Sequence, residues 1–190
     1  HLTERNFRKA LKVDGTVAMI AELKRKSPSK GMLRERFDPV QLAQSIEKAG
    51  AKALSVLTDE QFFGGSLDFL KDVKAFTEVP VLRKDFIVDP YQVHEAAVHG
   101  ADAVLLIVRI LSDEVLAECL QAVDKLGMEA LVEVHSPEDL RGALSSGAGI
   151  IGINHRDLRT FEMQPKLSEQ LIPMIPAGKT IVAESGLSTP

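Results

Sequence analysis

Four short apolar runs in this chain each carry a side chain that could transfer a proton or bind a polar substrate. Lys84 closes VPVLRK, Glu133 lies inside LVEV, Asn154 follows IIGI, and Glu184 closes TIVAE. Carboxylates can act as general acids or bases. A desolvated lysine could be a better proton donor, or it could attack a carbonyl as an amine. For Lys84 taken alone, a structural ion pair with a carboxylate on a neighbouring strand is an equally good interpretation.

A fifth run, AMIAELK, contains Glu22 and ends with Lys24. In an extended segment side chains alternate, so these two point to the same side of the strand. Charges on an otherwise apolar strand must be paired or used. The loop that follows, SPSKG, indicates no more than a turn when it is taken alone.

The residues at the later strand ends point to acid–base chemistry and anion binding. The valines on both sides of Glu133 are predicted to disfavour its charged form and to tune it as a general acid or base. Asn154 offers a donor and an acceptor to substrate hydroxyls. Arg156 can pair with a phosphate or a carboxylate through its planar fork. Gly186 lets the backbone approach an anion, and the helix expected after it would present unpaired N–H groups.

Clear helix signals separate these runs. Asp38, Asp89 and Ser136 each precede a proline, which fits a capping side chain followed by the first helical residue. Four glycines fit the ends of helices: Gly50, Gly100, Gly127 and Gly147. Strands are predicted near residues 17–23, 53–57, 80–84, 102–108, 130–134, 149–153 and 180–184. Helices are predicted near residues 39–49, 66–75, 90–99, 112–126, 137–146 and 166–174.

The alternation of strands and helices predicts an α/β fold with a parallel sheet. Near-continuous apolar strands such as AVLLIV indicate burial on both faces. A doubly wound open sheet and a (β/α)8 barrel both fit, but an open sheet usually binds its ligand at one switch point. The barrel is the better prediction, because all seven strands end at polar residues or loops, those at Thr58 and Arg109 included. A complete barrel has about 250 residues, so the seventh helix and the eighth strand–helix unit are expected to be missing.

The composition argues against several classes of protein. The 190 residues are 45% hydrophobic, enough for the core of one domain, and the net charge of −4 disfavours a nucleic-acid or membrane-surface protein. No apolar run approaches the roughly 20 residues that cross a bilayer. The histidines lack the spacing of a helical zinc pair, so no metal site is predicted. The single Cys119 is interpreted as core filler, and a reducing cytoplasm is the expected location.

Seven blocks follow one another from about residue 17 to residue 190: IAELKRKSPSKG, SVLTDEQFFGGS, VLRKDFIVDPYQ, ADAVLLIV, LVEVHS, IGINHRDL and VAESG. In this order and spacing they resemble the indole-3-glycerol phosphate synthase family of tryptophan biosynthesis. The resemblance implies a single (β/α)8 barrel domain over residues 1–190, with residues 1–15 as the remnant of an N-terminal helical extension. It also implies a lyase that uses no cofactor or metal and acts on a small phosphorylated substrate.

Members of this family close 1-(2-carboxyphenylamino)-1-deoxyribulose 5-phosphate to indole-3-glycerol phosphate, with loss of carbon dioxide and water. The resemblance implies that Lys84 protonates the substrate carbonyl and that Glu133 handles the proton transfers of dehydration. Lys24 would share the acid duty, and Glu22 would hold Lys24 or Lys84 in place and tune its charge. Which lysine serves which step stays open. The other implied residues orient hydroxyls and carboxylates, contact the phosphate, or form the slot for the anthranilate ring. The orienting residues would be Asn154, Glu184 and Ser185. The phosphate contacts would be Lys24, Ser27, Arg156 and Gly186. The slot for the ring would be formed by Pro28, Phe63, Phe86, Leu105 and Leu158.

The glycine and serine that follow the eighth strand in the family have no counterpart in this sequence. The chain alone is therefore expected to be weakly active or inactive, or to self-associate through the open edge of its barrel. Two other interpretations remain. One is a barrel aldolase that uses Lys84 as a Schiff-base nucleophile on a sugar phosphate, and the other is a non-catalytic folding fragment. The order of the seven blocks favours the synthase.

Overall fold

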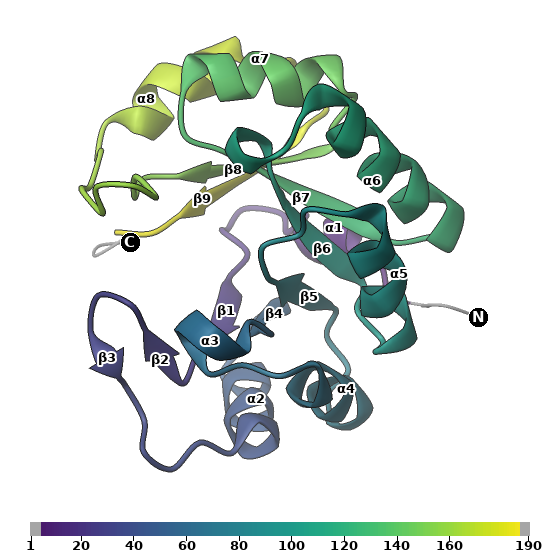
Figure 1. Ribbon diagram of the computed structural model, residues 1–190, viewed down its shortest axis with the longest axis vertical. Coiled ribbons are helices and arrows are strands. Elements are labelled where there is room, and N and C mark those ends of the chain that lie inside the picture. Colours follow the sequence, from purple (N-terminus) through teal and green to yellow (C-terminus); the bar gives the residue numbers. More distant parts are fainter. Residues whose placement is uncertain (1–4, 187–190) are drawn as a thin grey trace.

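The predicted strands form one parallel sheet that curls around an interior (Figure 1). The computed structural model describes residues 5–186. Neighbouring strands of this sheet are parallel and follow the order β1-β4-β5-β6-β7-β8-β9. The strands are β1 (Ile20–Leu23), β4 (Ala53–Leu57), β5 (Val81–Lys84), β6 (Ala103–Ile107), β7 (Glu129–Val134), β8 (Ile150–Asn154) and β9 (Thr180–Glu184). The fold is a partial (β/α)8 barrel, as predicted.

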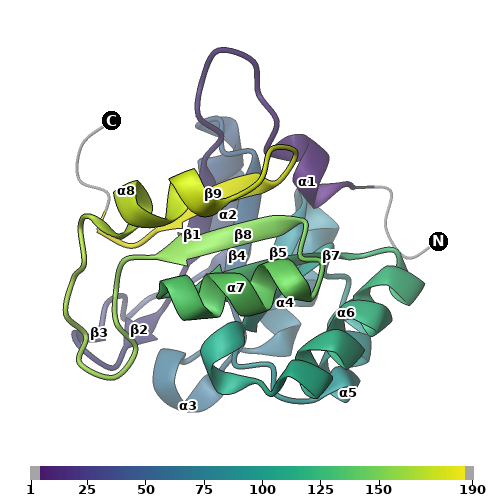
Figure 2. The same cartoon turned by 90° about the horizontal axis from the view of Figure 1, so that it is seen from above.

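Helices cover the outside of the curled sheet (Figure 1, Figure 2). They are α2 (Pro39–Lys48), α4 (Leu67–Phe76), α5 (Pro90–Val98), α6 (Asp113–Leu126), α7 (Pro137–Ser145) and α8 (Leu167–Leu171), which continues as the 3-10 helix η2 (Ile172–Met174). Asp38, Asp89 and Ser136 each accept a hydrogen bond from a backbone N–H of the first turn, as the proline signals predict. The glycines expected at helix ends have positive φ angles, from 67° at Gly127 to 103° at Gly50, a region that glycine enters without strain.

The sheet separates two apolar clusters, because side chains alternate along a strand. Outward-facing residues such as Leu54 and Val132 pack against the helices. Inward-facing residues such as Leu82 and Leu131 fill the base of the barrel. Burying one such side chain stabilises the fold by about 1.5–3 kcal/mol. The inward positions nearest the carboxyl ends of the strands are polar instead, so a polar site lies above an apolar floor.

The N-terminal segment packs against the base of this barrel. The short helix α1 (Phe7–Ala10) buries Phe7 completely among inward-facing residues such as Ala53, which begins β4. Arg8 reaches the segment before β9, where its guanidinium donates a hydrogen bond to the carbonyl oxygen of Gly178. The segment expected to be a remnant of a helical extension thus contains a short helix at the N-terminal end of the strands. Residues 1–4 of that prediction lie outside the described range.

Three local features differ from the prediction. The SPSKG loop belongs to a small antiparallel hairpin, β2 (Lys26–Ser27) paired with β3 (Gly31–Met32). A one-turn helix, α3 (Glu60–Phe63), follows β4. After β6 the chain turns into the 3-10 helix η1 (Val108–Ile110), which contains Arg109. Each of these elements has four residues or fewer, too few for a periodic pattern to mark it in the sequence.

The strands β1 and β9 form the two edges of the sheet. Among the described residues neither pairs with a second strand. Met19, just before β1, and Ile181, in β9, are 66% and 39% exposed. Within residues 5–186 there is no helix both long enough and apolar enough to cross a membrane.

Candidate active site

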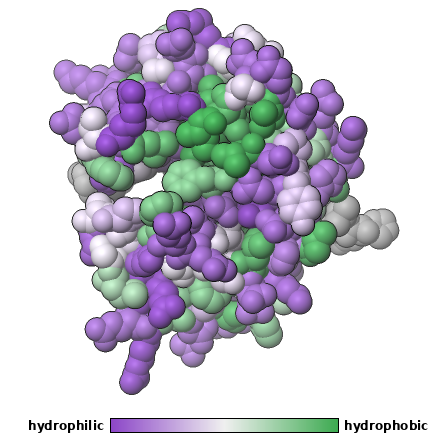
Figure 3. Space-filling view, viewed as in Figure 1, coloured by the Kyte–Doolittle hydropathy of each residue, from purple (hydrophilic) through white to green (hydrophobic). Residues whose placement is uncertain are grey.

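The carboxyl ends of the strands surround a cavity of about 800 Å³. Figure 3 shows a hollow on the side of the molecule where the ends of β9 and the β2–β3 hairpin face each other in Figure 1. Every residue that the sequence assigns to the site lines the cavity. These are Glu22, Lys24, Ser27, Pro28, Phe63, Lys84, Phe86, Leu105, Glu133, Asn154, Arg156, Leu158, Glu184, Ser185 and Gly186. Parallel topology thus gathers side chains that are spread over most of the chain.

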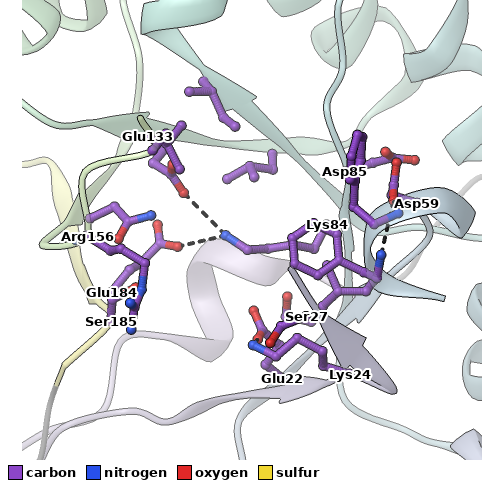
Figure 4. A pocket seen from close by; sticks show the side chains of 18 of the residues that line it. Glu22, Lys24, Ser27, Asp59, Lys84, Asp85, Glu133, Arg156, Glu184 and Ser185 are labelled. Carbon is purple, nitrogen blue, oxygen red and sulfur yellow. Dashed lines mark hydrogen bonds and ion pairs between the residues drawn. The ribbon is translucent and has the colours of Figure 1, made fainter. Parts of the chain in front are cut away.

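Lys84 is the centre of the charged cluster. Its Nζ, at the end of β5, lies 3.2 Å from Oε2 of Glu133 on β7 and 3.0 Å from Oε2 of Glu184 on β9 (Figure 4). The three side chains are 18%, 1% and 13% exposed, respectively. One ammonium is therefore held between two largely buried carboxylates that come from different strands.

The surrounding carboxylates keep Lys84 protonated. Burial alone would lower the pKa of its ammonium, but the charges of Glu184, Glu133 and Glu22 outweigh burial and raise the pKa above its ordinary value. The expectation that desolvation makes this ammonium a better acid is therefore wrong for this arrangement. A Schiff-base nucleophile needs the neutral amine, and the raised pKa disfavours that form.

Glu133 does not have the charge state expected of it. Burial would raise the pKa of its carboxyl group, but the Lys84 ammonium and the adjacent His135 outweigh burial and lower the pKa to about 2. Nε2 of His135 lies 3.2 Å from Oε1 of Glu133. The flanking Val132 and Val134 belong to the outer apolar cluster, so they do not surround the carboxylate. Glu133 is ionised at neutral pH and can accept a proton.

Glu184, and not Glu133, has the raised pKa that was expected of a general acid or base in this site. Burial raises the pKa of Glu184 to about 7, with Lys84 opposing burial and Glu133 adding to it. A carboxyl group with this pKa exchanges its proton near neutral pH, which suits a general acid or base. The sequence names Glu184 among the side chains that could transfer a proton, and the family resemblance implies that it orients the substrate. Its acid–base capacity depends on partners 51 and 100 residues away in the chain, at Glu133 and Lys84 (184 − 133 and 184 − 84).

Glu22 and Lys24 face the cavity from β1 and the residue after it, as strand alternation predicts (Figure 4). Their side chains form an ion pair, and each is about one third exposed, at 35% and 31%. Of the two lysines that Glu22 was expected to hold, the structure pairs it with Lys24, and Glu22 acts on Lys84 only through its charge. An exposed pair of this kind contributes little to stability, so a substrate can separate it at small cost.

Phe63 and Phe86 form an aromatic wall. Their ring centroids lie 6.2 Å apart with the planes tilted by 39°, within the range of favourable aromatic pairs. Asp59 caps α3 by accepting hydrogen bonds from the N–H groups of Phe62 and Phe63, and so fixes the position of Phe63. Phe62 also lines the cavity but is 47% exposed. It is therefore part of the wall at the solvent edge.

Basic and hydroxyl groups enter the cavity wall from the hairpin and from the loops after β8 and β9. Ser27 and Lys30 come from the hairpin, and Arg156 follows β8. The backbone N–H of Arg156 donates a 3.0 Å hydrogen bond to Oδ1 of Asn154, which fixes the amide of that side chain. Gly186 has a φ of 68°, a turn that brings the backbone to the cavity. The helix expected after Gly186 lies outside the described residues.

Two polar residues at predicted strand ends, Thr58 and Arg109, are not among those that line the cavity. The Thr58 hydroxyl donates a 2.6 Å hydrogen bond to Oδ2 of Asp85. Arg109 pairs with Asp139 and Asp157 at 3.2 and 3.0 Å. Both residues brace loops that carry cavity residues. Several other cavity residues were missed. The alternation of inward and outward side chains along the strands would have found Ser55, Leu57 and Ile107. The others lie in loops and short elements: Lys30, Leu33, Asp59, Asp85 and Phe161.

The remaining predictions concern cysteine and metal ligands. Cys119 is fully buried in the outer core, on α6, as predicted for core filler. Over the described part of the chain, no group of three or more His, Cys, Asp or Glu side chains is arranged to hold a metal ion.

The family model and the curated relatives point to the same family. The family model described as indole-3-glycerol phosphate synthase matches residues 2–190. An indole-3-glycerol phosphate synthase from Campylobacter hominis is 54% identical over 90% of this chain and 66% of its own length. One from Sulfurimonas denitrificans is 56% identical over 89% of this chain and 64% of its own length. The chain therefore spans about two thirds of the length of these relatives.

A solved structure supports the fold independently of sequence. The crystal structure of 3-keto-L-gulonate-6-phosphate decarboxylase from Vibrio cholerae is similar with a TM-score of 0.62, over 88% of this chain and 78% of that chain, at 12% sequence identity. At this identity the likeness concerns the barrel fold alone. The family itself is shown by sequence: this chain belongs to the indole-3-glycerol phosphate synthase family.

Proposed function

We propose that this chain carries the active site of an enzyme that converts 1-(2-carboxyphenylamino)-1-deoxyribulose 5-phosphate to indole-3-glycerol phosphate. The observation that carries the proposal is the Lys84 ammonium, held between Glu133 and Glu184 in a cavity with an aromatic wall. The cluster offers a proton donor, a proton acceptor and a group that exchanges its proton near neutral pH. A ring closure followed by a dehydration needs all three.

In the first step the aryl carbon that bears the carboxylate forms a bond to the ketone carbon of the ribulose chain. Lys84 gives a proton to the carbonyl oxygen, which becomes a hydroxyl group. The bond from the ring to the carboxylate then breaks, carbon dioxide leaves, and the electron pair of that bond restores the aromatic ring. Stabilising the charge that develops on the carbonyl oxygen is the main contribution of the buried ammonium.

In the second step the hydroxyl group leaves as water. Lys24, which faces the cavity beside Glu22, is placed to supply the proton that the departing oxygen takes. Glu133 is ionised because its pKa is lowered to about 2, so it can take the proton from the neighbouring methylene carbon. Glu184, with a pKa raised to about 7, can return protons between turnovers. The new double bond completes the indole ring.

The walls of the cavity suit the parts of this substrate. Phe63 and Phe86, with Pro28, Leu105 and Leu158, would hold the anthranilate ring. Arg156, Ser27 and the backbone at Gly186 would hold the phosphate. Asn154, Ser185 and Glu184 would orient the hydroxyl groups of the ribulose chain. Each role matches the chemistry of the side chain that we assign to it.

An aldolase that forms a Schiff base on Lys84 is the alternative within the same fold. The raised pKa of Lys84 disfavours it, because the nucleophile is the neutral amine. Borohydride reduction in the presence of a sugar phosphate would trap an adduct on Lys84 in that case. The synthase reaction passes through no such adduct, so mass spectrometry of the reduced protein separates the two functions.

The direct test is indole fluorescence after addition of the carboxyphenylamino substrate. We expect product from a chain extended by an eighth strand–helix unit of a relative, and weak or no turnover from this chain alone. Product from neither chain would contradict the proposed function, because the extension supplies every strand of the barrel. Equal rates in the two chains would contradict the need for the eighth unit.

We also propose that residues 1–190 act as one domain. We propose that the protein works in the cytoplasm on a small phosphorylated substrate. Finally, we propose that it can self-associate through the edge strands β1 and β9. Met19 and Ile181 expose apolar surface at or next to these edges, and unpaired strand edges favour association. Sedimentation velocity over a range of concentrations tests the last point. A monomer at every concentration would contradict it.

A further inference from the structure

Gly152 occupies an inward position of β8, between Ile150 and Asn154. Ile150 belongs to the inner apolar cluster and Asn154 lines the cavity. Side chains alternate along a strand, so a side chain at position 152 would point toward the same interior. Gly152 is not among the residues with a positive φ angle, and its backbone conformation therefore does not require glycine.

The space that a side chain would fill at this position holds the carboxylate of Glu184. A Cβ atom built on Gly152 would overlap Oε1 of Glu184 and lie 3.2 Å from Cδ1 of Leu131. The other oxygen of Glu184, Oε2, is the one that lies 3.0 Å from Nζ of Lys84. Within the described part of the chain Oε1 has no hydrogen-bond partner. Oε1 therefore lies in the space beside Gly152, while Lys84 holds the other oxygen of the same carboxylate.

The titratable groups that face Glu184 explain why this position matters. Lys84 from β5 and Glu133 from β7 both act on the Glu184 carboxyl group, and Glu22 from β1 acts on Lys84. A methyl group on Gly152 would force Oε1 of Glu184 out of this space, so the carboxylate could not keep its present position against Lys84.

We propose that Gly152 is a positioning residue whose missing side chain makes the seat for Glu184 between β8 and the Lys84 ammonium. The effect of Gly152 on turnover rests on the proposed function. The packing of the Glu184 carboxylate beside Gly152 does not. Any methyl group at position 152 displaces the carboxylate, removes it from its buried partners and weakens the binding of whatever Glu184 orients.

The test compares Gly152→Ala with Gly142→Ala. Gly142, on α7, would place a Cβ 3.3 Å from Val108, so the control introduces similar crowding away from the cavity. The first readout is an NMR titration of the protein labelled with ¹³C at the glutamate side-chain carboxyl carbons, with the Glu184 signal assigned by its loss in Glu184→Gln. The second readout is the affinity for a ribitol analogue of the substrate, in which an alcohol replaces the reactive ketone.

In the unchanged protein and in Gly142→Ala we expect the Glu184 signal to titrate near 7. In Gly152→Ala we expect its midpoint to fall toward the ordinary value of about 4.3, and the analogue to bind at least about tenfold more weakly, as loss of a charge-assisted contact implies. A folded Gly152→Ala protein with an unchanged midpoint and unchanged affinity would overturn the proposal. The titration needs no turnover, so it fails or succeeds independently of the proposed enzymatic activity.

A compensating variant guards against simple misfolding. Glu184→Asp shortens the side chain by one methylene group and so removes the overlap with a methyl group at position 152. We expect Glu184→Asp to weaken analogue binding by about tenfold on its own and by less than about threefold when it is added to Gly152→Ala. If Gly152→Ala fails to fold, the double variant should recover a cooperative unfolding transition. Additive losses of affinity, or a double variant that is also unfolded, would contradict the proposal. Either result would show that space for the Glu184 carboxylate does not explain the glycine at position 152.

Discussion

Nζ of Lys84 and Oε2 of Glu184 lie 3.0 Å apart, although 100 positions separate the two residues in the chain. The contact ties β5 to β9, and the pKa of Glu184 is raised to about 7 in spite of the adjacent cation. Glu133 is ionised on another side of the same ammonium. The three groups together therefore hold one proton that exchanges near neutral pH, which a merely structural ion pair does not need.

The raised pKa of Glu184 predicts a specific pH dependence of stability. Its folded pKa of about 7 lies above the unfolded value of about 4.3, so the native state binds more protons between these two values. The free energy of unfolding contributed by this group is fully present below pH of about 4 and is lost as the pH rises to about 7. Glu184→Gln should reduce that loss by about 1–3 kcal/mol.

Urea unfolding at pH 5 and pH 7.5 measures this difference for Glu184→Gln. The exposed Glu138 on α7 offers a matched control, Glu138→Gln. Glu133 does not interfere, because its lowered pKa of about 2 places its own contribution below pH of about 4.3. If Glu184→Gln and Glu138→Gln have the same pH dependence, the shifted pKa of Glu184 is wrong.

The contact between Phe63 and Phe86 predicts that the two rings bind the ligand as a unit. Phe63→Ala and Phe86→Ala should each weaken binding of the ribitol analogue by about 5- to 30-fold, since aromatic contacts contribute about 1–2 kcal/mol. The double variant should lose less than the sum of the single losses. Phe76→Ala is the control, because Phe76 is 60% exposed on α4. Strictly additive losses in calorimetry would contradict a shared aromatic wall.

The side chain of Arg156 is expected to bind the phosphate group. Arg156→Ala should weaken the analogue by about tenfold or more, because charge-assisted hydrogen bonds contribute about 1.5–3 kcal/mol. It should also reduce the competition of inorganic phosphate with the analogue. Arg159 lies in the same loop and is exposed, so Arg159→Ala tests for a general effect of charge. Equal losses in the two variants would remove Arg156 from the phosphate site.

Much of the fold could be predicted, because its signals are local. Capping residues such as Asp89 and the helix-ending Gly127 mark element boundaries within a few residues. Apolar runs give the strands, and parallel topology then places their polar ends at one cavity. The hairpin of β2 and β3 and the turn of α3 escaped prediction, since elements this short show no periodicity.

The charge states in the site could not be predicted, because they depend on partners from other strands. The valines beside Glu133 suggest an apolar setting, yet they face the outer cluster while the carboxylate meets Lys84 and His135. Similarly, nothing in the sequence next to Gly152 indicates that the carboxylate of Glu184 occupies the adjacent space. The sequence gives the residue types directly. A pKa or a contact between two side chains depends on which residues the fold brings together.

Asp102, the residue before β6, predicts a purely structural effect at the opposite end of the strands. Its side chain is fully buried, accepts hydrogen bonds from Lys74 at 2.6 Å and from the N–H of Val81 at 2.8 Å, and is not among the residues that line the cavity. Asp102→Ala leaves a partly buried cation and a buried N–H without this partner, so it should lower the free energy of unfolding by about 1–3 kcal/mol. Asp124→Ala, at an exposed position of α6, should change it little.

Urea unfolding checks the loss in Asp102→Ala, and calorimetry checks the site. At a temperature where the variant is folded, the ribitol analogue should bind within about twofold of its original affinity, since effects on well-separated sites are independent. A large loss of analogue affinity in folded Asp102→Ala would contradict the separation of the stabilising base from the ligand site.

The role of Lys84 as the proton donor can be measured by single-turnover indole formation in the extended chain. Lys84→Met should slow the appearance of indole at least about 100-fold, as loss of a general acid implies, while the analogue still binds. Lys71→Met, at an exposed position of α4, should keep the original rate. A Lys84→Met protein that forms indole at the original rate would show that the ammonium between Glu133 and Glu184 does not donate the proton.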